Sequence, residues 1–383
     1  MIRKILLTLI ILIVLFIIGF LIFKAFYNPP HPANMDFTNL SVIRAMRVDY
    51  LDEDKSRGEV AALNTQMEQS GVNLVAVGAG RADWTYFPWR DHPDRWSDEV
   101  RTSGIDYLLD DSLRFGKWAH VSAVVDVLSP LYIQAHPETA SISWVGVPSK
   151  NIVATMELVD GKFGQDLLDM IDEIASTYPV NSITISELVY YVDGFGEQDK
   201  AAYIAYTGQS DWPRVPDARQ INLDDPSIGV WRSYEIGRFL AKAAEITHKY
   251  GKQLFVETFI TEDQNANITV RNGTDISSLL AHADRIVVWG DHNLDEQHAQ
   301  AALPGFAQFL ARYGEKRIIM MIGLWNKSYD AGTPKNAMTS ISSDELRTAL
   351  FLANQRGITN LFITPSFLMS NAHWQVLKDL WGK

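Results

Sequence analysis

The stretch that decides the fold is Asn181–Trp212, which reads NSITISELVYYVDGFGEQDKAAYIAYTGQSDW. It opens with Ser182–Ser186, a short run rich in β-branched residues that is typical of a buried parallel strand. The run ends at Glu187, and a glycine-punctuated loop with two tyrosines and Asp193 follows. Loops after the carboxyl ends of parallel strands carry the chemistry of α/β barrels, so Glu187 is a candidate functional group. The alternative is that Glu187 only caps a loop or pairs with an arginine.

Strands and helices alternate along the rest of the chain with a period of roughly 30–45 residues, as βα units do. The eight expected strands are Val42–Val48, Val72–Val77, Ala119–Val127, Ser182–Ser186, Gln253–Glu257, Arg285–Trp289, Arg317–Ile322 and Asn360–Thr364. The clearest expected helices are Trp231–Tyr250, Glu296–Tyr313 and Asp344–Arg356. This pattern predicts a closed (β/α)8 TIM barrel. A doubly wound open sheet is the alternative, but no glycine-rich phosphate loop follows the first strand.

Local signals support this assignment. Two loops are long, which is usually a sign of function: Leu128–Phe163, with a hairpin expected around Ile142–Glu157, and Glu187–Gly229. Ser342 and Glu345 form a capping box at the start of a late helix. Five glycines stand where a helix should end in a left-handed residue: Gly71, Gly116, Gly251, Gly314 and Gly357.

An apolar run at the N-terminus, Ile5–Phe23, is interrupted only by Thr8 and Gly19. About 20 such residues cross the ~30 Å hydrocarbon layer of a membrane as a helix. Arg3 and Lys4 precede the run, which favours a cytoplasmic N-terminus. A cleaved signal peptide is the alternative, but its apolar region would be shorter and followed by a cleavage site of small residues.

The sequence therefore predicts three parts: a membrane anchor at residues 1–27, a proline-rich spacer at 28–40, and the barrel domain at 41–383. We expect a single-pass membrane protein with one N-terminal transmembrane helix and a cytoplasmic N-terminus. The barrel then lies outside the cytoplasm. The spacer is proline-rich and is expected to be semi-rigid.

Composition excludes several classes of protein. The chain has 383 residues, a net charge of −12, 47% hydrophobic residues and no cysteine. The hydrophobic content excludes a disordered chain, and the absence of cysteine excludes disulfides and thiol nucleophiles. The acidic balance argues against nucleic acid as a partner. No HExxH, GxSxG or P-loop motif occurs, so we expect neither a metal nor a cofactor.

Carboxylic acids lie at or just after the ends of the third to sixth expected strands, which a barrel brings to one rim: Asp126, Glu187, Glu257 and Asp291. Glycoside hydrolysis requires one carboxylic acid that protonates the leaving oxygen and a second carboxylate as nucleophile or base. We expect Glu187 to be the proton donor, because burial beside aromatic residues raises the pKa of a carboxyl group. Glu257 is the expected partner, and Asp291 is its competitor.

Aromatic residues on the strand-end loops are the expected walls of sugar subsites, because the apolar faces of sugar rings pack on aromatic planes. They are Trp84, Tyr86, Trp89, Tyr190, Tyr191, Trp289 and Trp325. The other expected substrate-binding residues are polar: Asp49, Arg81, Asp83, Asp126, Asp193, His292 and Asn326. An arginine beside Glu187 would lower its pKa and exchange the two catalytic roles; the candidates are Arg81 and Arg232.

Two runs of the chain resemble a known family. They are SELVYYVDGFGEQDKAAYIAYTGQSDWPR, which starts at Ser186, and IGVWRSYEIGRFLAKAAEITHKYGKQLFVE, which ends at Glu257. Both resemble the middle of the glycosyl-hydrolase-like family 10 group of TIM-barrel proteins, which is similar to the hydrolase domain of exported poly-N-acetylglucosamine hydrolases. The match covers about Val42 to the C-terminus. The resemblance implies a TIM barrel that hydrolyses an extracellular or cell-surface polysaccharide, with Glu187, and next Asp193, in the site.

The sequence also departs from that family. Members often place two adjacent acids after the fourth strand, whereas Leu188 follows Glu187 here. Many retaining barrel glycosidases hold a nucleophile on the seventh strand, which here reads RIIMMIGLW and has no acid. We therefore interpret the protein as a membrane-anchored extracytoplasmic glycoside hydrolase whose second carboxylate comes from the fifth or sixth strand. The alternative is a catalytically inactive glycan-binding barrel of a polysaccharide export or cell-envelope system.

Overall fold

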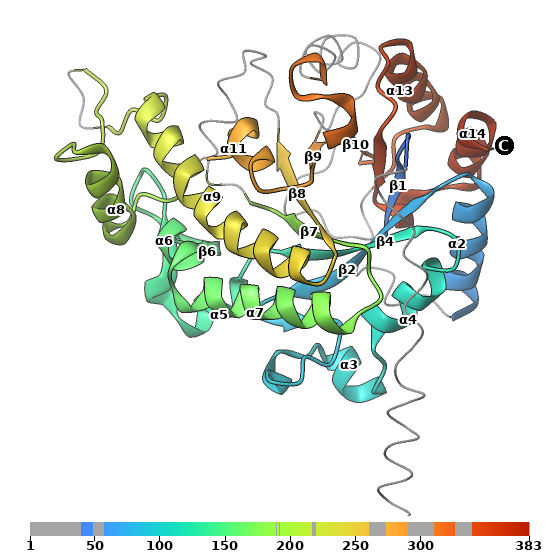
Figure 1. Ribbon diagram of the computed structural model, residues 1–383, viewed down its shortest axis with the longest axis horizontal. Coiled ribbons are helices and arrows are strands. Elements are labelled where there is room, and N and C mark those ends of the chain that lie inside the picture. The colour runs from blue at the N-terminus through green and yellow to red at the C-terminus, as the bar shows by residue number, and fades with distance from the viewer. Residues whose placement is uncertain are drawn as a thin grey trace, which may run out of the picture. The chain divides into compact units, whose positions relative to one another are not determined.

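Short runs of β-branched and apolar residues form a closed barrel of parallel strands, with helices around it (Figure 1). The order around the barrel is β1 (Arg44–Val48), β2 (Leu74–Arg81), β4 (His120–Asp126), β7 (Ser182–Ser186), β8 (Gln253–Phe259), β9 (Arg285–Trp289), β10 (Ile318–Gly323) and β11 (Leu361–Thr364). Strand β1 pairs in parallel with both β2 and β11, which closes the sheet. This closure confirms the (β/α)8 barrel and excludes the open doubly wound sheet.

The computed structural model describes residues 40–48, 57–188, 190, 192–216, 220–259, 273–289, 310–325 and 339–382. These residues all belong to one unit, Phe37–Lys383. The apolar run Ile5–Phe23 and the spacer lie outside them, so the anchor and the domain boundaries stay predictions. None of the helices in the described ranges is both long and apolar enough to cross a membrane.

Helices connect the strands on the outside of the barrel. They are α2 (Arg57–Gln69), α3 (Asp98–Ser103), α4 (Tyr107–Phe115), α5 (Pro130–Ala135), α6 (Thr155–Val159), α7 (Lys162–Thr177), α8 (Glu197–Thr207), α9 (Pro226–Lys249), α11 (Ile276–Leu280), α13 (Ser343–Gln355) and α14 (Asn371–Trp381). The short strand β3 (Trp84–Thr85) pairs antiparallel with β2. A separate antiparallel hairpin, β5 (Ala140–Ile142) and β6 (Pro148–Val153), confirms the hairpin predicted in the first long loop.

Most of the predicted strands, helix caps and left-handed glycines are confirmed. The eight strands lie where they were predicted, although β2 extends to Arg81 and β8 to Phe259. Ser342 and Glu345 form the predicted capping box. Most of the helix Glu296–Tyr313 lies outside the described residues. The predicted left-handed glycine at Gly116 is wrong, since its φ is −61° and its N–H continues the helical bonding of α4, whereas the other four glycines have positive φ.

Side chains of the barrel strands alternate between the inside and the surrounding helices. An apolar cluster fills the inside and includes Ala45, Val124 and Phe255. A larger cluster packs the helices, among them the neighbouring α7 and α9, against the outer face (Figure 1). Two residues further along the same three strands, the alternation places Arg47, Asp126 and Glu257 inside the barrel. The inside therefore changes from apolar to charged toward the carboxyl ends of the strands.

Candidate active site

Arg47 joins two carboxylates at the carboxyl end of the barrel. Its Nη1 lies 3.4 Å from Oε2 of Glu257, and its Nη2 lies 3.8 Å from Oδ1 of Asp126. All three residues are buried, so solvent screens their charges little. Arg47 is not among the site residues predicted from the sequence. The signal that could have found it is a cation at the end of a buried strand, on the same face as the barrel-filling Ala45.

Asp126, the last residue of β4, ties the neighbouring strand to this group. It lies opposite Ser186 in the parallel register, and the Ser186 hydroxyl donates a hydrogen bond to Oδ1 of Asp126. Ser186 is the last residue of β7 and directly precedes Glu187. The bond therefore fixes the point from which the Glu187 loop departs.

Glu257 is more deeply buried than Asp126 and Glu187, with 1% of its surface exposed. Its Oε2 accepts a hydrogen bond from Nε1 of Trp289 at 3.2 Å, in addition to the Arg47 contact. Its Oε1 has no hydrogen-bond partner among the residues that the structure describes. Burial raises the pKa of Glu257 to about 7, Arg47 opposes this, and the negative charges of Glu187 and Asp126 add to it. β8 continues past Glu257 to Phe259 and keeps the Glu257 side chain inside the barrel.

Glu187 interrupts the alternation of its strand. Because Ser186 faces Asp126 inside the barrel, a continued strand would turn the next side chain toward the helices. Glu187 instead has φ 61°, and in the described part of the chain it is the one non-glycine residue with positive φ. Such a conformation costs about 1–3 kcal/mol and is typical of functional sites when the surroundings hold it. It keeps the Glu187 carboxyl group close enough to Asp126 and Arg47 for their charges to change its pKa.

The pKa of Glu187 is raised to about 7, first by burial and then by the negative charge of Asp126, while Arg47 lowers it. The predicted direction is therefore confirmed, but the arginine is neither Arg81 nor Arg232. Glu187 has no hydrogen bond to its carboxyl group from the described residues, whereas Glu257 has two donors. Donors to a carboxylate favour its charged form. Of the coupled pair, Glu187 is therefore the one that holds a proton and Glu257 the one that stays ionised.

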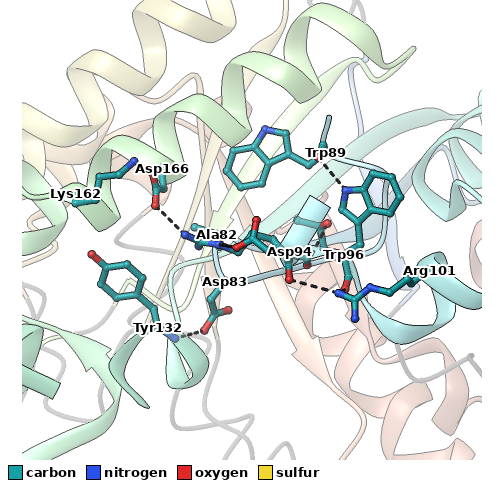
Figure 2. A network of polar contacts seen from close by, with 11 residues as sticks. Ala82, Asp83, Trp89, Asp94, Trp96, Arg101, Tyr132, Lys162 and Asp166 are labelled. Carbon is teal, nitrogen blue, oxygen red and sulfur yellow. Dashed lines mark hydrogen bonds and ion pairs between the residues drawn. The ribbon is translucent and has the colours of Figure 1, made fainter. Parts of the chain in front are cut away.

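Arg81, Asp83 and Trp84 form a separate group at the β2–β3 turn. Arg81 Nε lies 3.0 Å from Oδ1 of Asp83, and its guanidinium carbon lies 5.3 Å from the centre of the Trp84 ring. Oδ2 of Asp83 accepts the backbone N–H groups of Leu131 and Tyr132 at 2.8 and 3.1 Å; Figure 2 shows the contact with Tyr132. These bonds occupy the Asp83 carboxylate and tie it to the first turn of α5.

The loop after β3 packs into the protein. Arg95 donates to the carbonyl of Ala82 and pairs with the buried Asp166 of α7 at 3.2 Å. Nε1 of Trp96 donates to the carbonyl of Trp89 at 2.8 Å, as Figure 2 shows. Trp89 is 2% exposed and Tyr86 is 4% exposed. Both rings are therefore packed within the domain, and their predicted place in a sugar subsite stays a prediction. Trp84 is partly exposed and stays a prediction.

Two tryptophans form an aromatic wall beside Glu257. The rings of Trp289 and Trp325 stack with centroids 5.6 Å apart and an interplanar angle of 18°. Trp289 is buried and donates to Glu257, whereas Trp325 is partly exposed. These positions are consistent with the predicted roles in sugar binding, which stay predictions.

A second buried arginine, Arg232 of α9, lies against the loop that follows β7. Its Nη2 donates to the backbone carbonyl of Asp193, and its guanidinium carbon lies 4.6 Å from the centre of the Phe195 ring. Burial raises the pKa of the Asp193 carboxyl, and Arg232 opposes this. Tyr190 is 2% exposed and belongs to the main core. The loop turns this ring toward the core, and its predicted place in a sugar subsite stays a prediction.

Five of the predicted site residues lie outside the described part of the chain: Asp49, Tyr191, Asp291, His292 and Asn326. Their roles stay predictions, and Asp291 stays the competitor of Glu257. Within the described ranges, no group of three or more histidines and acids has the arrangement of a metal site.

No model of a known protein family matches the chain, and no curated protein sequence matches it. Solved structures do match. The PgaB (BpsB) glycoside hydrolase domain from Bordetella bronchiseptica is 15% identical with a TM-score of 0.68, over 89% of this chain and 99% of that domain. The catalytic domain of β-amylase from Paenibacillus polymyxa is 9% identical with a TM-score of 0.59, over 88% and 97%. A chitinase from Chromobacterium violaceum is 12% identical with a TM-score of 0.50, over 88% and 98%.

These structures are glycoside hydrolases of different kinds, and each matches almost along its whole length. At such low identities the likeness concerns the fold. The chain therefore has the TIM-barrel fold of the glycoside hydrolases that it resembles, and the resemblance found in its sequence is confirmed at the level of the fold.

Proposed function

We propose that the protein is a glycoside hydrolase that cleaves O-glycosyl bonds of an extracellular or cell-surface polysaccharide. The observation that carries this proposal is Glu187, which leaves its strand in a left-handed conformation beside Asp126 and has a pKa raised to about 7. A general acid must hold its proton near the working pH and release it to the leaving oxygen. Glu187 meets this requirement.

Glu257 supplies the second carboxylate. Its Oε2 is held by Arg47 and Trp289, which keeps the group ionised and fixed, while its Oε1 has no partner in the described part of the chain. A fixed carboxylate oxygen without a partner can attack the anomeric carbon or accept a proton from water. The anomer released first, identified by proton NMR, distinguishes these two mechanisms. Asp291 is the alternative for this role.

The stacked pair of Trp289 and Trp325 supports a sugar as the ligand, since it places an aromatic plane next to Glu257. The names of two similar structures, a β-amylase and a chitinase, are those of enzymes that act on polysaccharides, and this supports a polymer as the substrate. Neither a metal nor a cofactor is part of this proposal, because two carboxylates suffice for the reaction.

The apolar run Ile5–Phe23, with Arg3 and Lys4 before it, supports a single-pass anchor with the barrel outside the cytoplasm. This location gives the enzyme access to a cell-surface polymer. Protease treatment of intact cells tests the orientation. Removal of the barrel domain is the expected result, and protection of the domain would contradict it.

A screen of the purified full-length protein in detergent against bacterial exopolysaccharides tests the activity. New reducing ends in the presence of the native protein, and none with a Glu187→Gln/Glu257→Gln double variant, are expected. The absence of an acid on β10 favours a second candidate, a glycan-binding protein without activity. Saturable binding of a polysaccharide without any new reducing ends would support that candidate and contradict hydrolysis.

A further inference from the structure

We propose that Arg47 is the positioning residue that assigns the proton of this site to Glu187, because its guanidinium group contacts the carboxylates of Glu257 and Asp126. The catalytic consequence rests on the proposed function, whereas the distribution of charge follows from the contacts that Arg47 and its neighbours make with the three acids.

Arg47 contacts two acids with different nitrogens of one guanidinium group. Nη1 lies 3.4 Å from Glu257 and Nη2 lies 3.8 Å from Asp126. The guanidinium group is planar and stays charged, and its two terminal nitrogens are held in fixed directions. A lysine has a single ammonium group and lacks the two separate nitrogens that make these contacts. The geometry therefore fits an arginine, and not only a positive charge.

The charged groups that face this site come from four elements in the described part of the chain. Arg47 comes from β1, Asp126 from β4, Glu187 from the end of β7 and Glu257 from β8. β9 adds the N–H group of Trp289, and the described residues of β10 and β11 are uncharged.

The other two arginines near the site have partners of their own. Arg81 pairs with Asp83, and Arg232 donates to the carbonyl of Asp193. Neither one contributes to the pKa of Glu187 or Glu257. Arg47 is therefore the cation that balances the three acids of the described site.

The number of charges explains why one proton stays. If all three acids are ionised, the site carries two more negative than positive charges, and one bound proton reduces this excess to one. Arg47 and Trp289 donate to Glu257, while Arg47 and the Ser186 hydroxyl stabilise Asp126. Glu187 has no such donor among the described residues. The proton therefore binds to Glu187, which is the residue that the proposed reaction needs as an acid.

The substitution Arg47→Met removes the cation but keeps an unbranched apolar side chain. Among the described residues, Glu257 then has only the Trp289 N–H as a donor, and it should bind a proton at neutral pH. An opposite charge at this distance typically lowers a carboxyl pKa by about 1–3 units. Its loss should therefore raise the pKa of Glu257 by about one unit or more. Arg47→Lys keeps a charge near one acid only, and an intermediate shift is expected.

Titration of ¹³C-labelled glutamate carboxyl groups by NMR tests this proposal without any need for activity. Full-length protein in detergent is compared as native protein, Arg47→Met and Arg47→Lys, with Glu187→Gln and Glu257→Gln to assign the signals. Arg81→Met is the matched control, because it removes an arginine near the site that does not contact these acids. The expected result is an upward shift of the Glu257 titration in Arg47→Met, a smaller shift in Arg47→Lys and none in Arg81→Met.

An unchanged Glu257 titration in folded Arg47→Met, or in Arg47→Lys if the methionine variant does not fold, would overturn the proposal. If a cleaved glycan is found, the acid limb of the pH profile of kcat/KM should move upward in Arg47→Met by the same amount. A shifted titration without cleavage of any glycan would keep the assignment of the proton and contradict the proposed function. Cleavage of a glycan without a shifted titration would support the proposed function and contradict the assignment of the proton.

Discussion

Two buried arginines act on the loop that follows β7, and both face acids. Arg47 lies inside the barrel and contacts the carboxylates of Glu257 and Asp126. Arg232 lies on α9 and contacts the backbone carbonyl of Asp193 and the ring of Phe195. The two groups are similar in composition, but their hydrogen bonds differ.

Asp199, a buried acid near Arg232, is held by backbone groups. Asp199 accepts the N–H groups of Thr155 and Met156 at 3.4 and 3.0 Å, which ties α8 to the start of α6. In the group of Arg47, Glu257 keeps one oxygen without a partner in the described ranges, and Glu187 has a left-handed backbone. A buried polar atom without a partner is costly, so it is kept where a ligand completes it. The comparison teaches that a carboxylate oxygen without a partner and a left-handed acidic residue, and not charge alone, distinguish the candidate active site from the group of Arg232.

The largest expected effect is the loss of activity in Glu257→Gln. The amide is neutral and cannot act as nucleophile or base, so kcat on a cleaved glycan should fall by about 10²–10⁴-fold. The matched control is Asp199→Asn, which neutralises a buried acid of the other group and should change kcat by less than tenfold. Full activity of Glu257→Gln together with loss of activity in Asp291→Asn would assign the second carboxylate to Asp291.

Arg232→Met should affect stability more than chemistry. Removal of one partner from a buried ionic group typically destabilises a protein by about 3–5 kcal/mol. The midpoint of urea unfolding should therefore fall, while kcat of the remaining folded protein at low temperature should change little. A large loss of kcat with an unchanged unfolding midpoint would contradict the purely structural role that we assign to Arg232.

The pH dependence follows from the two raised pKa values. Glu187 works in its protonated form, so activity should fall as the pH rises through about 7. Glu257 works as an anion, so activity should also fall on the acidic side, which makes the profile of kcat/KM bell-shaped. A profile that stays flat from pH 5 to 9 would contradict both roles.

Glu187→Gln should remove the part of the pH dependence of stability that comes from Glu187. The folded pKa of Glu187 lies above its ordinary value, so the native protein loses stability as the pH rises through about 7. Glutamine does not ionise. The melting temperature of Glu187→Gln should exceed that of the native protein by a few degrees at pH 8, and the difference should vanish near pH 4.5.

The smallest expected effect is that of Trp325→Ala. Loss of an aromatic contact is worth about 0.5–1.5 kcal/mol, so KM should rise by up to about tenfold with little change in kcat. Trp84→Ala is the control, since Arg81 lies over one face of that ring and a smaller rise is expected. An equal rise of KM in the two variants would contradict the proposed role of the Trp289–Trp325 pair in sugar binding.

The fold could be predicted from the sequence because each signal is local. Runs such as Ser182–Ser186 and Arg285–Trp289 are β-branched and bounded by turn residues, and both strands lie where they were predicted. Glu187 and Glu257 could be placed together for the same reason, since parallel strands bring their carboxyl ends to one rim.

The rest could not be predicted because it depends on the direction of single side chains. Trp89 and Tyr190 follow strand ends as Trp325 does, but the first two are buried by contacts with residues far away in the chain. The role of Arg47 depends on which face of a five-residue strand it occupies. The raised pKa of Glu257 depends on burial that only the closed barrel produces.

The most direct test of the proposed mechanism measures Glu187→Gln on two substrates, a cleaved natural glycan and an aryl glycoside whose leaving group needs no proton. A residue that only donates a proton should matter for the first substrate and much less for the second. We expect kcat on the glycan to fall by about 10²–10⁴-fold, with glycan binding intact and a far smaller loss on the aryl glycoside. Full activity of Glu187→Gln on the natural glycan would contradict its role as the acid and would favour Asp193 with Glu257 instead.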